Sequence, residues 1–246
     1  MRPFVVHARG LQKFSLIDYP GMVCATVFLA GCNLRCPYCH NPDLVLDSPH
    51  LPRIPEEELL YFLESRRGFI DGVCVSGGEP TLDPCLPGFL AHVKALGFRT
   101  KLDTNGTRPD VLARLLERGL VDYIAMDVKA PPDKYRRVTR SRVDPRTIEE
   151  SIRLVQRSAT NYEFRTTVVP GLLSPGDVEA AARWLQGASK YVLQPYRPPA
   201  KTLDPNWMRL PTCPYSRLER LAYRIAPLVA RVEIRNPAGG ETSVSI

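Results

Sequence analysis

Three cysteines lie close together near the N-terminus, at the spacing C-x₃-C-x₂-C: Cys32, Cys36 and Cys39. Thiolates are preferred ligands for iron–sulfur clusters and zinc, and three of them on one short loop can converge on a metal. Three is one fewer than the four cysteines that usually hold a [4Fe–4S] cluster. We therefore expect a cluster with one iron left open to a non-protein ligand, because a catalytic metal needs an open coordination position.

Three other interpretations of these cysteines explain fewer residues. The segment Cys36–Cys39 has the spacing of a glutaredoxin-like dithiol, but its second cysteine would then lie in a helix, where Pro42 would cost about 3 kcal/mol. A c-type haem attachment site, C-x-x-C-H ending at His40, requires export, and the sequence shows no export signal. A structural zinc site lacks an evident fourth ligand. An iron–sulfur cluster is therefore the favoured interpretation.

Short apolar runs alternate with amphipathic segments along most of the chain. This alternation predicts a parallel sheet with right-handed crossover connections. Six strand–helix units are too few for a closed eight-stranded barrel, so we predict an α/β fold, an open partial TIM barrel of the form (β/α)₆. The predicted strands are Val23–Leu29, Gly72–Val75, Thr100–Leu102, Tyr123–Met126, Phe164–Val169 and Tyr191–Gln194.

The composition is that of a globular protein, with 44% hydrophobic and 24% charged residues, which excludes a disordered chain. We expect residues 1–246 to form a single domain with a core over about residues 20–200. Residues 1–19 and 201–246 would be N- and C-terminal extensions. Helices are predicted over Glu56–Ser65, Leu86–Leu96, Asp110–Arg118 and Asp177–Leu185, and another is expected to begin after an N-cap at Asp144.

Further polar residues and glycines lie at the ends of the predicted strands. In parallel α/β folds the site lies at the carboxyl ends of the strands. Paired glycines allow a ligand to approach the backbone closely, and a glutamate can accept a hydrogen bond from an ammonium group. The residues selected for this reason are Gly77, Gly78, Glu79, Asp103, Thr104, Asp127 and Lys129. Arg165, at the beginning of the predicted strand Phe164–Val169, is selected because a buried arginine needs a partner.

Each of these residues also has a purely structural interpretation. The glycines and Glu79 could form a plain strand-to-helix turn, and Asp127 with Lys129 could be a surface ion pair of little energetic value. Arg165 could lie at a solvent-exposed rim. If it is buried instead, it must be paired, and the carboxylate of a cofactor would be a suitable partner.

The cysteine spacing, the aromatic residue before its last cysteine and its position directly after the first predicted strand resemble the signature of the radical SAM superfamily. The resemblance implies that the three cysteines bind three irons of a [4Fe–4S] cluster, while the amino and carboxylate groups of S-adenosylmethionine bind the fourth. Reductive cleavage of the sulfonium would release methionine and a 5′-deoxyadenosyl radical that abstracts a hydrogen atom. Tyr38 would lie against the adenine.

The resemblance also implies roles for the residues at the other strand ends. The Gly-Gly-Glu-Pro element would hold the amino group of the cofactor. In similar activating enzymes of glycyl radical enzymes, an Asp-Thr pair and a second Asp hold a monovalent cation beside the cofactor carboxylate, and a lysine lies near substrate and cofactor. Carried to this sequence, the cation site is Asp103, Thr104 and Asp127, and the lysine, predicted to be catalytic, is Lys129.

Segments within and beyond the cysteine motif together resemble one group more closely. Gly10–Gly21, Cys36–Pro42 and Gln194–Pro199 are similar to the anaerobic ribonucleoside-triphosphate reductase activating proteins, which are related to the pyruvate formate-lyase activating enzymes. This implies a glycyl radical enzyme as partner and a flavodoxin- or ferredoxin-type electron donor. Arg197 stands where many activating enzymes have a histidine, so no role is assigned to it.

Two alternatives to glycyl radical activation belong to different classes. One is a radical SAM enzyme that acts on RNA or a small metabolite, which the net charge of +7 permits. The other is a cluster- or zinc-binding scaffold without turnover. The basic segment, residues 134–142, is either a docking surface for the partner or a solvated loop.

The sequence predicts a cytoplasmic protein with no membrane association, and we do not expect a nucleic-acid partner. The longest apolar run, Met22–Ala30, is far shorter than the roughly 20 residues of a membrane helix. Seven cysteines in a reducing compartment indicate metal ligation or catalysis. Outside the motif, Cys24 and Cys74 are expected to be buried in strands, and Cys85 and Cys213 are isolated.

Overall fold

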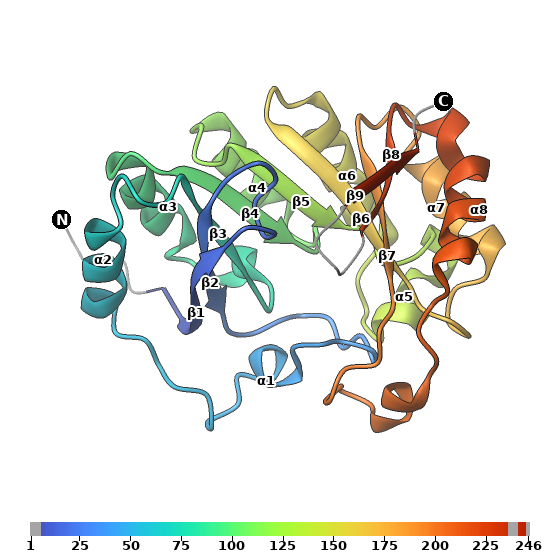
Figure 1. The fold of residues 1–246 in the computed structure, drawn as a ribbon, viewed down its shortest axis with the longest axis horizontal. Coiled ribbons are helices and arrows are strands. Elements are labelled where there is room, and N and C mark those ends of the chain that lie inside the picture. The colour runs from blue at the N-terminus through green and yellow to red at the C-terminus, as the bar shows by residue number, and fades with distance from the viewer. Residues whose placement is uncertain (1–5, 236–240, 245–246) are drawn as a thin grey trace.

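A computed structural model of the chain describes residues 6–235 and 241–244. In this part of the chain nine strands form one sheet, in chain order, with helices packed along its outer side (Figure 1). The strands are β1 (Ala8–Ser15), β2 (Cys24–Leu29), β3 (Gly72–Gly77), β4 (Arg99–Thr104), β5 (Tyr123–Asp127), β6 (Asn161–Val168), β7 (Tyr191–Pro195), β8 (Val232–Arg235) and β9 (Glu241–Val244). The helices are α1 (Pro42–Val45), α2 (Glu56–Ser65), α3 (Leu86–Ala95), α4 (Pro109–Glu117), α5 (Tyr135–Thr139), α6 (Pro145–Arg157), α7 (Pro175–Trp184) and α8 (Tyr215–Ile225).

The sheet is open and mostly parallel. Strands β2 to β8 pair in parallel, whereas the edge strands β1 and β9 are antiparallel to their neighbours. The six predicted strands correspond to β2–β7, so the predicted α/β fold with an open partial barrel is confirmed. Parallel pairing brings the carboxyl ends of seven strands to one edge of the sheet, where the predicted site residues lie.

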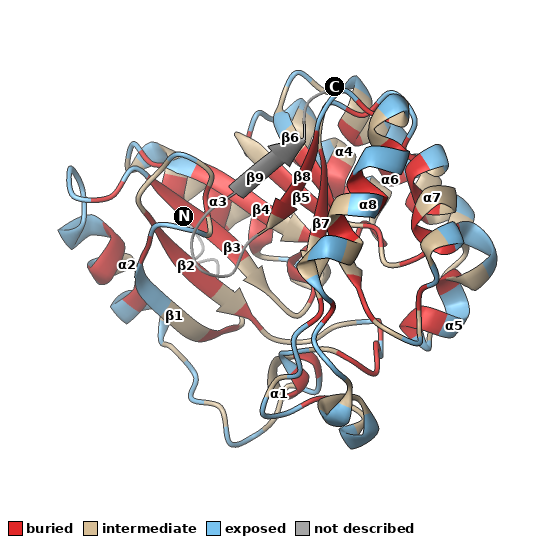
Figure 2. Ribbon diagram, turned by 45° about the vertical axis from the view of Figure 1, so that its right-hand side comes forward, coloured by how far each residue is buried: buried red, intermediate tan, exposed pale blue. Residues whose placement is uncertain are grey.

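The core lies between the sheet and its helices, where buried residues concentrate (Figure 2). Five of the six residues of β2 are buried, as expected for a strand covered on both faces. Helix α6 begins where Asp144 caps it, with the carboxylate accepting a hydrogen bond from Arg146 N at 3.0 Å. Its apolar stripe, which includes Ile148 and Ile152, is buried. No helix in the described ranges is long and apolar enough to cross a membrane.

Both predicted extensions add strands to the sheet. Residues 8–15 form β1 and pair with β2, from Ala8 opposite Leu29 to Ser15 opposite Cys24. The C-terminal segment supplies α8, β8 and β9. Its buried positions on α8, Leu218, Leu221, Ala222 and Ile225, have the i, i+3, i+4, i+7 spacing of a helix that covers a sheet.

Two glycines at the end of β3 allow it to touch the loop that follows β2. Gly77 has a φ of +118°, a conformation that side-chain-bearing residues rarely adopt. A Cβ on Gly78 would lie 2.0 Å from the carbonyl oxygen of Gly31. Directly beyond, Glu79 N donates a hydrogen bond to that same oxygen at 2.7 Å. The backbones of the two loops therefore cross in direct contact.

Replacing Gly78 with Ala should lower the free energy of unfolding by about 2 kcal/mol or more, because the new methyl group meets backbone that cannot rotate away. Urea unfolding followed by circular dichroism measures this. Gly176→Ala is the matched control, since its Cβ would have only Ser174 Oγ nearby, at 3.8 Å. Equal stability of the two variants would show that the contact is not tight.

Candidate active site

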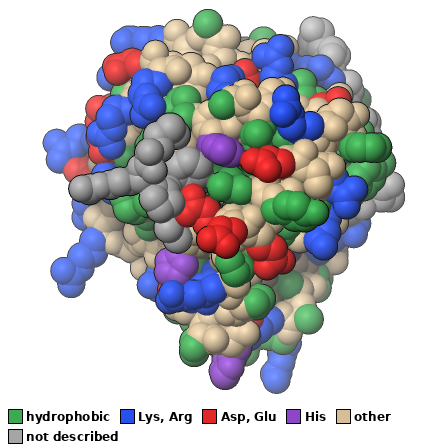
Figure 3. All heavy atoms as spheres, turned by 90° about the vertical axis from the view of Figure 1, so that its left-hand side faces the viewer, with side chains coloured by type: hydrophobic (Ala, Val, Ile, Leu, Met, Phe, Trp, Pro, Cys, Tyr) green, Lys and Arg blue, Asp and Glu red, His purple; other side chains and the backbone are tan. Residues whose placement is uncertain are grey.

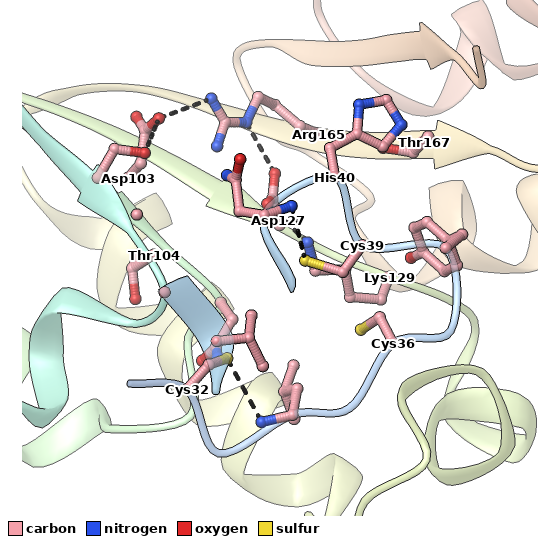
Figure 4. Close-up of a pocket in the computed structure, with 18 of the residues that line it drawn as sticks. Cys32, Cys36, Cys39, His40, Asp103, Thr104, Asp127, Lys129, Arg165 and Thr167 are labelled. Carbon is pink, nitrogen blue, oxygen red and sulfur yellow. Dashed lines mark hydrogen bonds and ion pairs between the residues drawn. The ribbon is translucent and has the colours of Figure 1, made fainter. Parts of the chain in front are cut away.

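A cavity of about 350 Å³ opens at the carboxyl ends of the parallel strands, a size suited to a small-molecule site (Figure 4). Its walls combine the loop after β2 with side chains from β3 to β7. Most of the residues selected from the sequence line it: Cys32, Cys36, Tyr38, Cys39, Gly77, Gly78, Asp103, Thr104, Asp127, Lys129 and Arg165. The structure thus brings together residues that are up to 133 positions apart in the chain.

The three cysteines lie on residues 31–41, called the cysteine loop from here on. Backbone hydrogen bonds attach this loop to distant segments. Arg35 N donates to Thr139 O at 2.9 Å, and Pro37 O accepts from Asp204 N at 3.1 Å. The loop is therefore held from both sides by residues more than 100 positions away.

The local structure bears directly on the dithiol interpretation of the cysteines. Pro42 is the first residue of α1, so Cys39 precedes the helix and the glutaredoxin-like arrangement is absent. Figure 4 shows Cys32 on one side of the cavity and Cys36 and Cys39 on the other.

Burial disfavours free thiolates at Cys32 and Cys36. Burial raises the pKa of the Cys32 thiol to about 11 and that of Cys36 to about 12. Both thiols are therefore protonated at neutral pH until a metal displaces the proton. Backbone amides lie beside two sulfurs, with Leu34 N 3.4 Å from Cys32 Sγ and Asn41 N 3.4 Å from Cys39 Sγ.

Asp103, Asp127, Lys129 and Arg165 form the charged floor of the cavity. Arg165 lies between the two carboxylates: its Nε donates to Asp127 Oδ1 at 2.8 Å, and its Nη1 lies 3.3 Å from Asp103 Oδ2. Lys129 Nζ donates to the other oxygen of Asp127 at 2.7 Å. Arg165 is buried and paired, as the sequence analysis required of an arginine inside the fold.

The floor residues are charged at neutral pH. Burial alone would raise the pKa of the Asp127 carboxyl, but Arg165 and Lys129 hold it below its ordinary value. Burial would likewise lower the pKa of Lys129, yet Asp127 keeps it well above the ordinary value. The pairing with Asp127 thus favours the ammonium form of Lys129.

Lys101 adds a further charge beneath the floor, on the side of Asp103 away from the cavity. The sequence analysis did not select it. Its Nζ donates to Asp103 Oδ1, and its side chain is only 2% exposed. The two residues are two positions apart on β4, so they share one face of the strand. A lysine inside a predicted buried strand, at this spacing from an aspartate, was the available signal.

Glu79 does not line the cavity and is bound by protein donors. Its carboxylate accepts hydrogen bonds from Thr81 N at 3.1 Å and Thr81 Oγ1, from Thr104 Oγ1 at 2.7 Å and from Asn105 N at 2.6 Å. Burial raises its pKa, and these donors act in the opposite direction. Glu79 thus ties the turn after β3 to the turn after β4, and its contact with a cofactor ammonium stays a prediction.

Asn105 connects the turn after β4 to the cysteine loop. Its Nδ2 lies 3.7 Å from Cys32 Sγ and donates to Asn33 Oδ1 at 3.1 Å. Its own Oδ1 accepts from Thr107 N at 3.0 Å, which fixes the orientation of the amide. The sequence analysis assigned no role to Asn105.

The remaining predicted residues have ordinary surroundings. The Tyr38 ring is buried and packs edge-on against Tyr196, with ring centroids 6.5 Å apart. Arg197 is exposed and does not line the cavity. Cys24 and Cys74 are buried, as expected, and Cys85 and Cys213 lie far along the chain from the cysteine loop and do not line the cavity.

An open parallel sheet with a three-cysteine loop over its carboxyl edge defines an enzyme of the iron–sulfur partial-barrel class. The chain belongs to the radical SAM superfamily, whose family model matches residues 26–185. Membership implies a [4Fe–4S] cluster and S-adenosylmethionine as cofactors.

Two similar proteins of known sequence cover most of the chain. "Putative glycyl-radical enzyme activating enzyme MJ1227" of Methanocaldococcus jannaschii is 34% identical over 235 residues, which is 94% of this chain and 96% of that protein. The pyruvate formate-lyase-activating enzyme of Clostridium pasteurianum is 31% identical over 169 residues, 66% of this chain and 68% of that enzyme.

Solved structures share the fold at low sequence identity. The structure of TYW1 with a lysine-pyruvate adduct aligns with a TM-score of 0.57 at 16% identity, over 87% of this chain and 76% of that one. Streptococcus suis SuiB bound to S-adenosylmethionine aligns with a TM-score of 0.61 at 13% identity, over 84% of this chain and 48% of that one. These likenesses show that the partial-barrel fold is common to all three proteins.

Replacing Arg165 with Gln should lower the free energy of unfolding at pH 7 by about 3 kcal/mol, because two buried carboxylates lose a shared partner. The stability that Asp127 gains from a lowered pKa is present above pH ~4 and is lost as the pH falls through its folded value. The difference in free energy of unfolding between wild type and Arg165→Gln should therefore become smaller below pH ~4.

Urea unfolding at several pH values tests this. Arg146→Gln, which removes an exposed ion pair with Asp144, is the control and should change stability little at any pH. If the difference in free energy of unfolding between Arg165→Gln and wild type stays constant from neutral to acid pH, the ion pairs of Arg165 do not contribute to stability as described.

Proposed function

We propose that this protein is a glycyl-radical-enzyme activating enzyme whose partner is an anaerobic ribonucleoside-triphosphate reductase. The observation that carries the proposal is the similarity to a protein with an activating-enzyme name along 94% of this chain and 96% of that protein. The partner is inferred from the resemblance of Gly10–Gly21 and Gln194–Pro199 to reductase activating proteins.

The lining of the cavity fits the cofactors that the family implies. The thiols of Cys32, Cys36 and Cys39 would hold three irons and leave the fourth for S-adenosylmethionine. Arg165 lines the cavity, and among the described residues its Nη2 makes no hydrogen bond, so it can bind a carboxylate. Gly77 and Gly78 carry no side chain that would obstruct the approach of a ligand to their backbone.

The bound cluster and S-adenosylmethionine would supply reductive radical chemistry: one electron from a flavodoxin- or ferredoxin-type donor would cleave the sulfonium to methionine and a 5′-deoxyadenosyl group, and hydrogen from a partner glycine would complete 5′-deoxyadenosine. The protein's own part is to position these groups. Lys129 holds a fixed positive charge through Asp127, 2.7 Å away, beside the cysteine loop. Tyr38 supplies an aromatic face in the same cavity.

The first test is production of 5′-deoxyadenosine under anaerobic conditions. Protein with a reconstituted cluster should form it from S-adenosylmethionine and a strong reductant, and Cys36→Ala should form none, because a cluster ligand is lost. Absence of product from wild type carrying a reducible cluster, both alone and with the reductase, would favour the scaffold interpretation.

The second test identifies the hydrogen donor. The reductase with deuterated glycine, bulk RNA and small metabolites are offered separately, and deuterium in 5′-deoxyadenosine is measured by mass spectrometry for the labelled reductase. We expect label and a glycyl radical signal in electron paramagnetic resonance with the reductase. Stimulation by RNA or a metabolite, without a glycyl radical, would overturn the assignment.

The basic segment, residues 134–142, is a candidate docking surface beside the cysteine loop. Its arginine side chains are exposed at Arg136, Arg137, Arg140 and Arg142. Thr139 within it bonds the cysteine loop through Arg35 N. Another face of the molecule has the opposite character: acidic side chains gather at the centre of the side that carries α2 (Figure 3).

Replacing Arg136 and Arg137 with Glu should weaken activation of the reductase about tenfold or more, because the reversed charges repel an acidic partner surface. Cofactor cleavage without the partner should be unchanged. Arg118→Glu with Arg183→Glu makes the same change in net charge on the exposed ends of outer helices and is the control. Equal activation by the two double variants would remove the docking role.

A further inference from the structure

Every carboxylate oxygen on the floor already has a cationic partner from the protein. Asp127 is bound by Arg165 on one oxygen and by Lys129 on the other. Asp103 is bound by Arg165 on one oxygen and by Lys101 on the other. The monovalent cation implied by the family resemblance would therefore have to displace existing ion pairs.

The third expected cation ligand is also engaged. Thr104 Oγ1 donates to Glu79 Oε1 at 2.7 Å and accepts from Gly106 N at 3.1 Å. The residues expected to bind the cation thus do not fit it.

The ammonium group of Lys101 is enclosed by the protein beside the floor. Its side chain is 2% exposed, and its Nζ lies between Asp103 Oδ1 and Cys74 Sγ, which is 3.7 Å away. A buried ammonium is stable only beside a compensating carboxylate, and Asp103 is that carboxylate. Lys101 therefore acts as a permanent counter-ion on the side of Asp103 away from the cavity.

The charge balance leads to the same conclusion. Three cations, Lys101, Lys129 and Arg165, face two carboxylates, Asp103 and Asp127, which leaves one surplus positive charge on the floor. The carboxylate of an incoming amino acid group would neutralise it. A metal ion would instead add a second surplus charge in a buried place, which is unfavourable.

We propose that Lys101 and Arg165 replace a monovalent metal ion in this protein, so that S-adenosylmethionine is bound without K⁺ or Na⁺. The inference rests on the cofactor that family membership implies and is independent of which partner enzyme is activated. Lys101 is a positioning residue, because it acts on the cofactor through Asp103 and Arg165.

The test measures binding rather than turnover. The dissociation constant of S-adenosylmethionine is determined by anaerobic isothermal titration calorimetry for the cluster-loaded protein. The buffers contain tetramethylammonium, Na⁺ or K⁺ chloride at equal ionic strength. Wild type should bind with constants that agree within about twofold across the three buffers, a difference of under 0.5 kcal/mol.

Lys101→Met keeps the apolar stem and removes the charge. In tetramethylammonium it should bind S-adenosylmethionine about tenfold more weakly than wild type, and K⁺ or Na⁺ should restore part of the loss. Lys94→Met is the matched control: it also breaks a lysine–aspartate pair, with Asp122 at 2.8 Å, but that aspartate does not line the cavity, whereas Asp103, the partner of Lys101, does. It should behave as wild type in all buffers.

Three results would overturn the inference. Tenfold tighter binding by wild type in K⁺ or Na⁺ than in tetramethylammonium would show that a metal ion is required. Wild-type affinity of Lys101→Met in every buffer would show that its charge is not used. No binding by wild type in any buffer would overturn the cofactor proposal as well, which distinguishes the two failures. The wild-type series decides the question even if Lys101→Met does not fold.

Discussion

The contact between the backbones of Gly31 and Gly78 is the constraint on which the site depends. It joins the start of the cysteine loop to the end of β3, and Glu79 N bonds the same Gly31 oxygen at 2.7 Å. Glu79 then carries the connection to the turn after β4 through Thr104 and Asn105. One close approach thus connects the cysteine loop to the turns after β3 and β4, and a side chain at position 78 would disrupt it.

The floor shows how parallel strands can bury charge at acceptable cost. Its ions come from the ends of β4, β5 and β6, where the strands run side by side. Pairs two residues apart, Lys101 with Asp103 and Asp127 with Lys129, form within one strand, and Arg165 joins them across strands. Because each charge has an opposite neighbour, the ionised state is stable in a place where an isolated charge would not be.

The sequence predicted those parts of the structure that depend on local pattern. Six strands, the cap at Asp144 and the grouping of the site residues at strand ends all follow from periodicity and from parallel topology. The strands near the two edges of the sheet could not be predicted in this way. Strand β1 carries the exposed polar residues Gln12 and Lys13. Strand β8 contains Glu233, a buried charge that is tolerated because Lys190 lies 2.6 Å away. Such pairing is a property of the folded chain.

In the site, too, local pattern was predictable and contacts between distant residues were not. The spacing of the cysteines was sufficient to indicate a cluster with an open iron. The partners of each side chain were not predictable, so Glu79 was expected in the cavity although protein donors surround it. Lys101 was hidden for the opposite reason, because a lysine inside an apolar strand contributes nothing to a hydrophobic pattern.

The attachment of the cysteine loop has a consequence for how its atoms divide their tasks. The bonds from Arg35 to Thr139 and from Asp204 to Pro37 involve backbone groups and none of the three sulfurs. The loop is therefore held by contacts that do not involve its thiols, in contrast to small zinc domains whose folding is driven by the metal. Anchoring and ligation are thus carried by different atoms of the same loop: backbone groups attach it to the fold, and the sulfurs are left to act as ligands.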